Sequence, residues 1–73
     1  MSREEIIASI ADILEVEEKD VDVSKALEEY ESWDSVAVLS VVSLYTDITG
    51  KFIHASDVLQ LSSVGELIDF LNA

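Results

Sequence analysis

The sequence predicts an all-α protein, a bundle of three main helices and one short helix with a long loop between the first two. Three observations predict this class. Apolar residues recur at helical spacing in three segments. Residues that cap helices stand at the ends of those segments. No strand alternation is present except a weak one at 51–53. With 73 residues, the chain is expected to form one domain over 1–73.

The first helix is expected to run from a capping box to about Leu14. Ser2 followed by Glu5 is the pattern of that box, in which the two residues satisfy each other's backbone N–H groups. The apolar positions fall on one stripe: Ile6, Ile10, Ile13 and Leu14. Residues 15–33 then lose the pattern. We expect a long loop there, with a turn of helix around 26–29, and loops of this length often carry function.

The second helix is predicted over Ser35–Thr49. Asp34 is the expected N-cap, and Gly50 is the expected C-terminal stop, since glycine readily adopts the left-handed conformation found there. Trp33 precedes the cap and Val38 is the fourth helical residue, which is the spacing of a hydrophobic staple.

Two more helices complete the predicted bundle. A short one is expected to start near Ser56 or Asp57 and to direct three side chains towards the core: Val58, Leu59 and Leu61. Ser63 and Glu66 form a second capping box. The last helix that it opens should bury one face, made of Val64, Leu67, Ile68 and Leu71.

Charge and composition restrict the functions available. The formal net charge is −12, from 16 acids and 4 bases. Such a surface repels nucleic acid and anionic membranes and attracts basic proteins. The chain is 49% hydrophobic, too apolar for a disordered acidic tail. The N-terminal segment resembles neither a signal peptide nor a membrane span. Cysteine is absent, which fits a cytoplasmic location and leaves no thiol for chemistry.

The second helix carries one anomaly. Its apolar arc is broad, which predicts a central helix, and its polar strip is narrow, made of Ser40, Ser43 and Asp47. Val36 falls in the middle of that strip and directly follows Ser35. An apolar residue on the solvent face, beside a serine at the start of a helix, is the feature of this segment that needs an explanation.

These residues resemble a known family. Asp34-Ser35-Val36 is similar to the Asp-Ser-Leu motif that begins the second helix of acyl carrier proteins. The flanking ESWDSVAVLSVVSLYTDITGKFI and the closing SSVGELIDFL also resemble that family, as does the order of helices over the whole chain. The resemblance implies a four-helix bundle of acyl-carrier type with 4′-phosphopantetheine, taken from coenzyme A, joined to Ser35 through a phosphodiester. The thiol of that arm would carry acyl groups as thioesters.

The resemblance also implies roles for the neighbouring residues. Asp34 would cap the helix beside the site. Val36 and nearby acids would form the docking surface, the acids being Glu28, Glu29, Glu31 and Asp47. The protein would not be an enzyme and would have no catalytic residue. Its partners would be a phosphopantetheinyl transferase and enzymes of fatty acid, lipid or polyketide biosynthesis that load, condense or transfer acyl groups. We expect a monomer without nucleic acid or membrane partners.

The match has departures from the family pattern. Valine replaces leucine after the serine, Thr49 stands where phenylalanine is common, and the second helix offers few acids. These departures favour a specialised stand-alone carrier over the general fatty-acid carrier. Capped helices near both ends also favour a complete domain.

Two alternatives lack a prosthetic group. Residues 20–31 place oxygen-bearing side chains at five positions of a calcium loop, but Lys25 stands where such a loop needs glycine. We therefore expect no dedicated metal site. A helical adaptor without any covalent arm is the other alternative. His54, the single histidine, has no neighbouring nucleophile in the sequence and is interpreted as a surface or core-edge residue.

Overall fold

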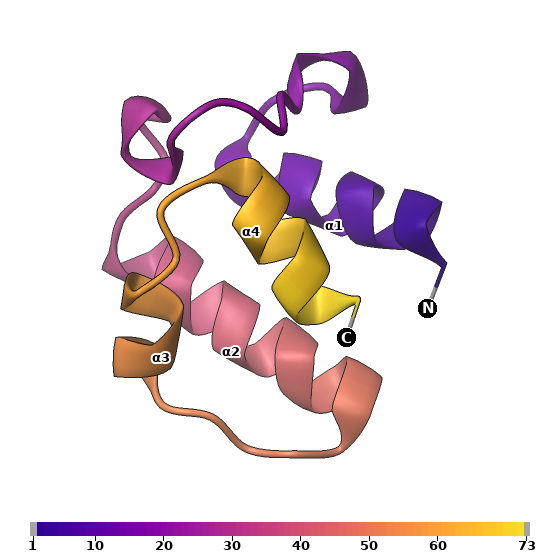
Figure 1. Cartoon of the computed structure of the whole chain (residues 1–73), viewed down its shortest axis with the longest axis vertical. Helices are drawn as coiled ribbons and strands as arrows, with labels where there is room; N and C mark the ends of the chain where they lie inside the picture. The colour runs from indigo at the N-terminus through magenta and orange to yellow at the C-terminus, as the bar shows by residue number, and fades with distance from the viewer. Residues whose placement is uncertain (1, 73) are drawn as a thin grey trace.

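A computed structural model describes residues 2–72, which form an all-helical fold measuring 28 × 24 × 17 Å. Its four α-helices are α1 (Arg3–Leu14), α2 (Ser35–Thr49), α3 (Ala55–Leu59) and α4 (Val64–Leu71). Figure 1 shows α4 lying across the space between α1 and α2, with α3 beside the first half of α2. Helix α2 contacts all three other helices, as expected for a central helix. The predicted bundle of three longer helices and a short one is confirmed.

Local hydrogen bonds set the helix ends where the sequence predicts them. The Ser2 hydroxyl accepts from the Glu5 N–H at 3.2 Å, and the Glu5 carboxylate accepts from the Ser2 N–H at 3.1 Å. The same exchange joins Ser63 and Glu66 at the start of α4. Hydrogen bonds from the side chain and backbone of Ser62, and from the Ser63 backbone, hold the pKa of the Glu66 carboxyl below its ordinary value. Both capping boxes are therefore confirmed.

The end of α1 differs from the usual glycine stop. Glu15 has φ 57° and ψ 42°, the left-handed conformation that favours glycine. The Glu15 N–H bonds to the Asp12 carbonyl at 3.2 Å and the Val16 N–H to the Ala11 carbonyl at 3.0 Å, which is the pairing of a Schellman motif. A non-glycine residue in this conformation costs about 1 kcal/mol. At the end of α2, Gly50 occupies the same conformation with φ 74°, as predicted.

The core lies where the three longer helices meet. Its largest fully buried side chains come from α1, the loop, α2, α3 and α4: Ile6, Ile10, Leu14, Leu27, Val41, Val58, Val64, Leu67, Ile68 and Leu71. No polar or charged residue among 2–72 is buried. Burial of each large side chain contributes about 1.5–3 kcal/mol. The helical stripes predicted for α1 and α4 thus form the core, except that Ile13 is only half-buried.

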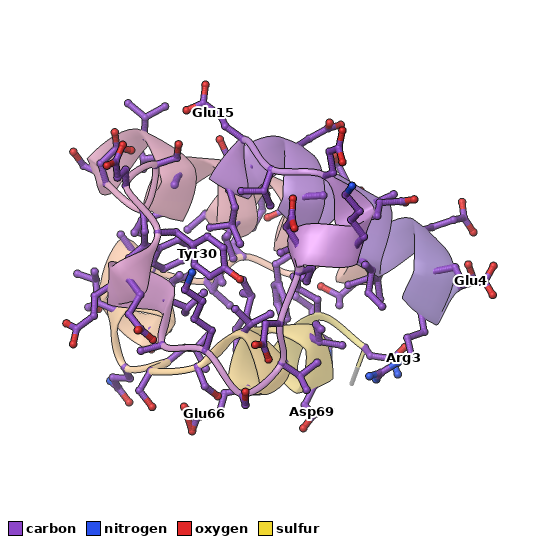
Figure 2. All side chains as sticks on the ribbon, turned by 90° about the horizontal axis from the view of Figure 1, so that it is seen from above. Arg3, Glu4, Glu15, Tyr30, Glu66 and Asp69 are labelled. Carbon is purple, nitrogen blue, oxygen red and sulfur yellow. The ribbon has the colours of Figure 1, made fainter. Side chains whose placement is uncertain are left out.

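The long loop between α1 and α2 is held against α4 and by a buried tyrosine. The N–H groups of Val64 and Gly65, at the start of α4, donate to loop carbonyls at 25 and 23, each at 3.0 Å. The Tyr30 hydroxyl donates to the Asp20 carbonyl at 3.1 Å, and the residue is 6% exposed. Figure 2 shows Tyr30 in the interior, while the labelled acids lie at the periphery. The expected helical turn is present at Leu27–Glu29, and a second one, which was not expected, lies at Glu18–Asp20.

Three expectations need correction. Helix α3 begins at Ala55, one or two residues earlier than predicted. Leu59, expected in the core, is 64% exposed, because α3 is short and turns only Val58 fully inwards. Residues 51–53 form no strand, and no strand occurs elsewhere in residues 2–72, where a single isolated bridge joins Ala26 and Ser63.

Candidate functional site

The start of α2 presents a serine to solvent. Ser35 is the first helical residue and is exposed, as is Asp34 before it. The Asp34 carboxylate accepts from the Ala37 N–H at 3.0 Å, which is the predicted N-cap bond. No described residue accepts a hydrogen bond from the Ser35 hydroxyl. The cap therefore orders the backbone at Ser35, while the Ser35 side chain is exposed and donates to no described residue.

Two backbone donors remain available beside that hydroxyl. The cap uses the N–H of Ala37, and the N–H of Val38 bonds to the Asp34 carbonyl at 3.0 Å. The N–H groups of Ser35 and Val36 have no acceptor among residues 2–72. Free N–H groups at a helix start, together with the positive end of the helix dipole, favour a phosphate oxygen. The site thus fits a serine-linked phosphodiester.

An apolar pocket opens on one side of the serine, between α2 and α3. Its volume is about 380 Å³, within the range of small-ligand sites. The residues that line it are Trp33, Asp34, Ser35, Val38, Leu39, Ala55 and Leu59. Trp33 is half-buried and packs against the core, and it lines this pocket together with Val38, which agrees with the predicted staple. A group attached to Ser35 would therefore start at the edge of an apolar cavity.

A polar groove lies on the other side, between α1 and α2. Its part nearest the serine has a volume of about 330 Å³ and is lined by Asp12, Ile13, Glu15, Ser32, Asp34, Val36, Ala37 and Ser40. A second hollow, towards the end of α2, shares Asp12, Ile13 and Ser40 with it. The start of α2 is therefore a ridge with an apolar pocket on one flank and an acidic groove on the other.

The structure brings only some of the predicted docking residues together. Val36 is 70% exposed and adjoins Ser35 on the ridge. Glu28 lines a further pocket that shares Trp33 and Leu59 with the apolar one, so it lies near the site.

The other three predicted docking acids are placed differently. Glu29 and Glu31 are exposed in the loop, and the Glu29 carboxylate accepts from the Ala26 N–H at 2.9 Å. Asp47 is twelve residues after Ser35, about 18 Å along the helix axis. It lies in the far hollow of the α1–α2 groove and is separate from the serine.

Sequence reasoning missed two apolar residues at the site. Leu39 is 61% exposed and lines the apolar pocket with Leu59. Leu39 follows Ser35 by four residues, and this spacing places the two on the same helix face, so a signal was present. No comparable signal exists for Leu59, whose position depends on how α3 packs.

The geometry gives little support to the calcium-binding alternative or to a chemical role for His54. No group of three carboxylate, imidazole or thiol side chains gathers around a possible metal position within residues 2–72. Asp22, in the suspected calcium loop, instead accepts hydrogen bonds from the N–H and hydroxyl of Ser24. Those bonds lower the pKa of the Asp22 carboxyl. His54 is exposed just before α3, and its N–H bonds to the Asp57 carboxylate at 3.0 Å.

Comparison with known proteins identifies the family. The family model described as a phosphopantetheine attachment site matches residues 4–71. The comparisons with curated proteins and with solved structures found no significant match. The chain belongs to the phosphopantetheine attachment family of acyl carrier-type proteins. It is a non-catalytic carrier whose prosthetic group is 4′-phosphopantetheine.

Membership in this family also defines the general kinds of partner. Carrier domains interact with phosphopantetheinyl transferases and with enzymes that handle acyl groups. None of the helices described within residues 2–72 has the length and apolar character needed to cross a bilayer.

Proposed function

We propose that Ser35 carries the 4′-phosphopantetheine arm and that the arm presents acyl groups, held as thioesters, to biosynthetic enzymes. The observation that supports this most strongly is the exposed hydroxyl of Ser35 at the first position of the capped helix α2. A transferase needs access to the hydroxyl, and the free N–H groups of Ser35 and Val36 stabilise the phosphodiester that forms.

The attachment step makes one bond and breaks one. The Ser35 oxygen attacks the pantetheine-bearing phosphorus of coenzyme A. The P–O bond to the adenosine-bearing phosphate breaks, adenosine 3′,5′-bisphosphate leaves, and a base of the transferase takes the hydroxyl proton. Asp34 keeps the helix start ordered through its bond to the Ala37 N–H at 3.0 Å. Because that carboxylate acts as a cap, we assign it a positioning role.

The cargo is proposed to be an acyl group with an apolar chain. The pocket between α2 and α3 begins at Ser35 and has apolar walls formed by Trp33, Leu39 and Leu59. Such walls favour hydrocarbon over a charged group, since burying an unpaired charge is costly. This supports fatty acyl or reduced polyketide intermediates over free-amine aminoacyl groups, and it fits a role in fatty acid, lipid or polyketide biosynthesis.

The partners are proposed to contact the ridge that carries the serine. Val36, 70% exposed beside Ser35, would contribute an apolar contact to the transferase and to enzymes that load, condense or transfer the acyl group. The loop acids Glu28, Glu29 and Glu31, and Asp47 further along α2, would attract basic docking surfaces. We propose that residues 1–73 act as one monomeric carrier domain in the cytoplasm.

The attachment site is tested by incubating the protein with coenzyme A and a broad-specificity phosphopantetheinyl transferase and measuring intact mass. The wild type should gain one 4′-phosphopantetheine, and Ser35→Ala should gain none. Ser43→Ala, an exposed serine further along α2, is the matched control and should behave as wild type. An unmodified wild type, or a modified Ser35→Ala, would refute the proposal. Intact mass of protein purified from its own host would identify the cargo.

A further inference from the structure

One hydrogen bond links α1 to the segment that precedes the serine. The Ser32 hydroxyl donates to the Glu15 carboxylate at 2.5 Å, across seventeen positions of sequence. Within residues 2–72 it is the only hydrogen bond between two side chains that lie more than four positions apart. All the other long-range order of the loop comes from backbone groups, Tyr30 and apolar packing.

The backbone of Glu15 does not explain why a glutamate is present. The residue occupies the left-handed position that closes α1, at φ 57°, where glycine is the favoured residue. The Schellman hydrogen bonds at this position use only backbone groups. The carboxylate therefore adds nothing to the helix end itself, and the interaction that the structure gives it is the one with Ser32.

Ser32 is connected to the serine site by a short series of hydrogen bonds. Its carbonyl accepts from the Asp34 N–H at 3.0 Å, and the Asp34 carboxylate then caps α2 at Ala37. Glu15, Ser32, Asp34 and Val36 also line the same hollow between α1 and α2. A restraint on Ser32 is thus a restraint on the residue that orients the start of α2.

We infer that Glu15 is a positioning residue for the modification of Ser35, acting through its hydrogen bond to Ser32. This inference rests on the proposed attachment at Ser35. The bond holds residues 32–34 against α1, so the transferase meets an ordered segment and does not have to order it on binding. Losing the bond should slow modification without unfolding the protein.

Glu15→Gly and Ser32→Ala each remove one partner of the hydrogen bond between Glu15 and Ser32. Each should lower kcat/KM for phosphopantetheine transfer about fivefold, which corresponds to about 1 kcal/mol. The double variant should lose no more than either single variant, because both remove the same interaction. The melting temperature of Glu15→Gly should equal or exceed that of wild type, since glycine suits the left-handed conformation. Trp33, the single tryptophan, adjoins Ser32, and its fluorescence anisotropy should fall in both variants.

Two further variants separate the effect of the hydrogen bond from the effect of the negative charge of Glu15. Glu15→Gln keeps a hydrogen-bond acceptor but removes the charge, and it should stay within about twofold of wild type. Asp12→Asn removes a charge from the same groove without touching the link, and it should also stay close to wild type.

Equal rates for wild type, Glu15→Gly and Ser32→Ala would overturn the inference. A fivefold loss in Asp12→Asn or Glu15→Gln would also overturn it, and would indicate direct contact between groove acids and the transferase. If the wild type itself is not modified at Ser35, the proposed function fails, which is a separate result.

Discussion

Leu59 and Leu67 give the most direct test of the packing, because the same substitution should have very different costs at the two positions. Leu67 is fully buried in α4, whereas Leu59 is 64% exposed on α3. Truncation of a buried leucine to alanine typically costs 2–5 kcal/mol, so we expect about 3 kcal/mol for Leu67→Ala. A domain of this size has a free energy of unfolding of about 5 kcal/mol. Leu67→Ala should therefore keep about 2 kcal/mol, enough to remain folded at room temperature but with a much lower urea midpoint.

The expected cost for Leu59 follows from its exposure. About a third of the residue is buried, and full burial of a leucine contributes about 2 kcal/mol, so Leu59→Ala should cost about 0.7 kcal/mol. Urea unfolding, followed by circular dichroism, measures both variants against wild type with the slope of the transition as a check on two-state behaviour. A cost for Leu59→Ala equal to that for Leu67→Ala would refute the exposed position of Leu59, and with it the apolar pocket beside Ser35.

Two other outcomes are expected. Asp34→Ala should lower the free energy of unfolding by about 1 kcal/mol, because the hydrogen bond to the Ala37 N–H is lost. Asp34→Asn should lose much less stability, because asparagine also caps helices. Equal losses for the two variants in thermal unfolding would contradict the capping role of Asp34. Added sodium chloride, and more strongly millimolar magnesium, should raise the melting temperature. The net charge of −12 opposes compaction, and among residues 2–72 one ion pair, Lys19–Glu17, offsets part of it. A melting temperature that stays flat across the salt titration would contradict this reasoning.

The starts of α1, α2 and α4 could be predicted from sequence because they depend on nearby residues. The bonds at Ser2–Glu5, Asp34–Ala37 and Ser63–Glu66 each span three positions. A side chain and a backbone group so close in sequence meet whenever the helix forms, whatever surrounds it. The exposed serine at the start of α2 followed from the same local pattern.

Residues whose surroundings come from distant segments were predicted less well. Leu59 has the spacing of a core residue, yet the path of α3 across α2 leaves it at the surface, where it joins Leu39 and Trp33 around one pocket. Glu15 and Ser32 are seventeen positions apart and share no motif. Asp47 carries the same charge as the loop acids, but twelve helical residues separate it from Ser35.

The three longer helices, their caps, the acidic surface and the presence of Asp34-Ser35 at the start of the central helix can all be inferred from the amino-acid sequence alone. These features depend on hydrogen bonds and periodicity within a few residues of each position, and on simple counts of charge. The packing of the helices sets which flank of Ser35 is apolar and which is acidic, and it places the end of α1 next to the segment before α2. Those features depend on the packing of helices that are remote in sequence, which no local pattern specifies.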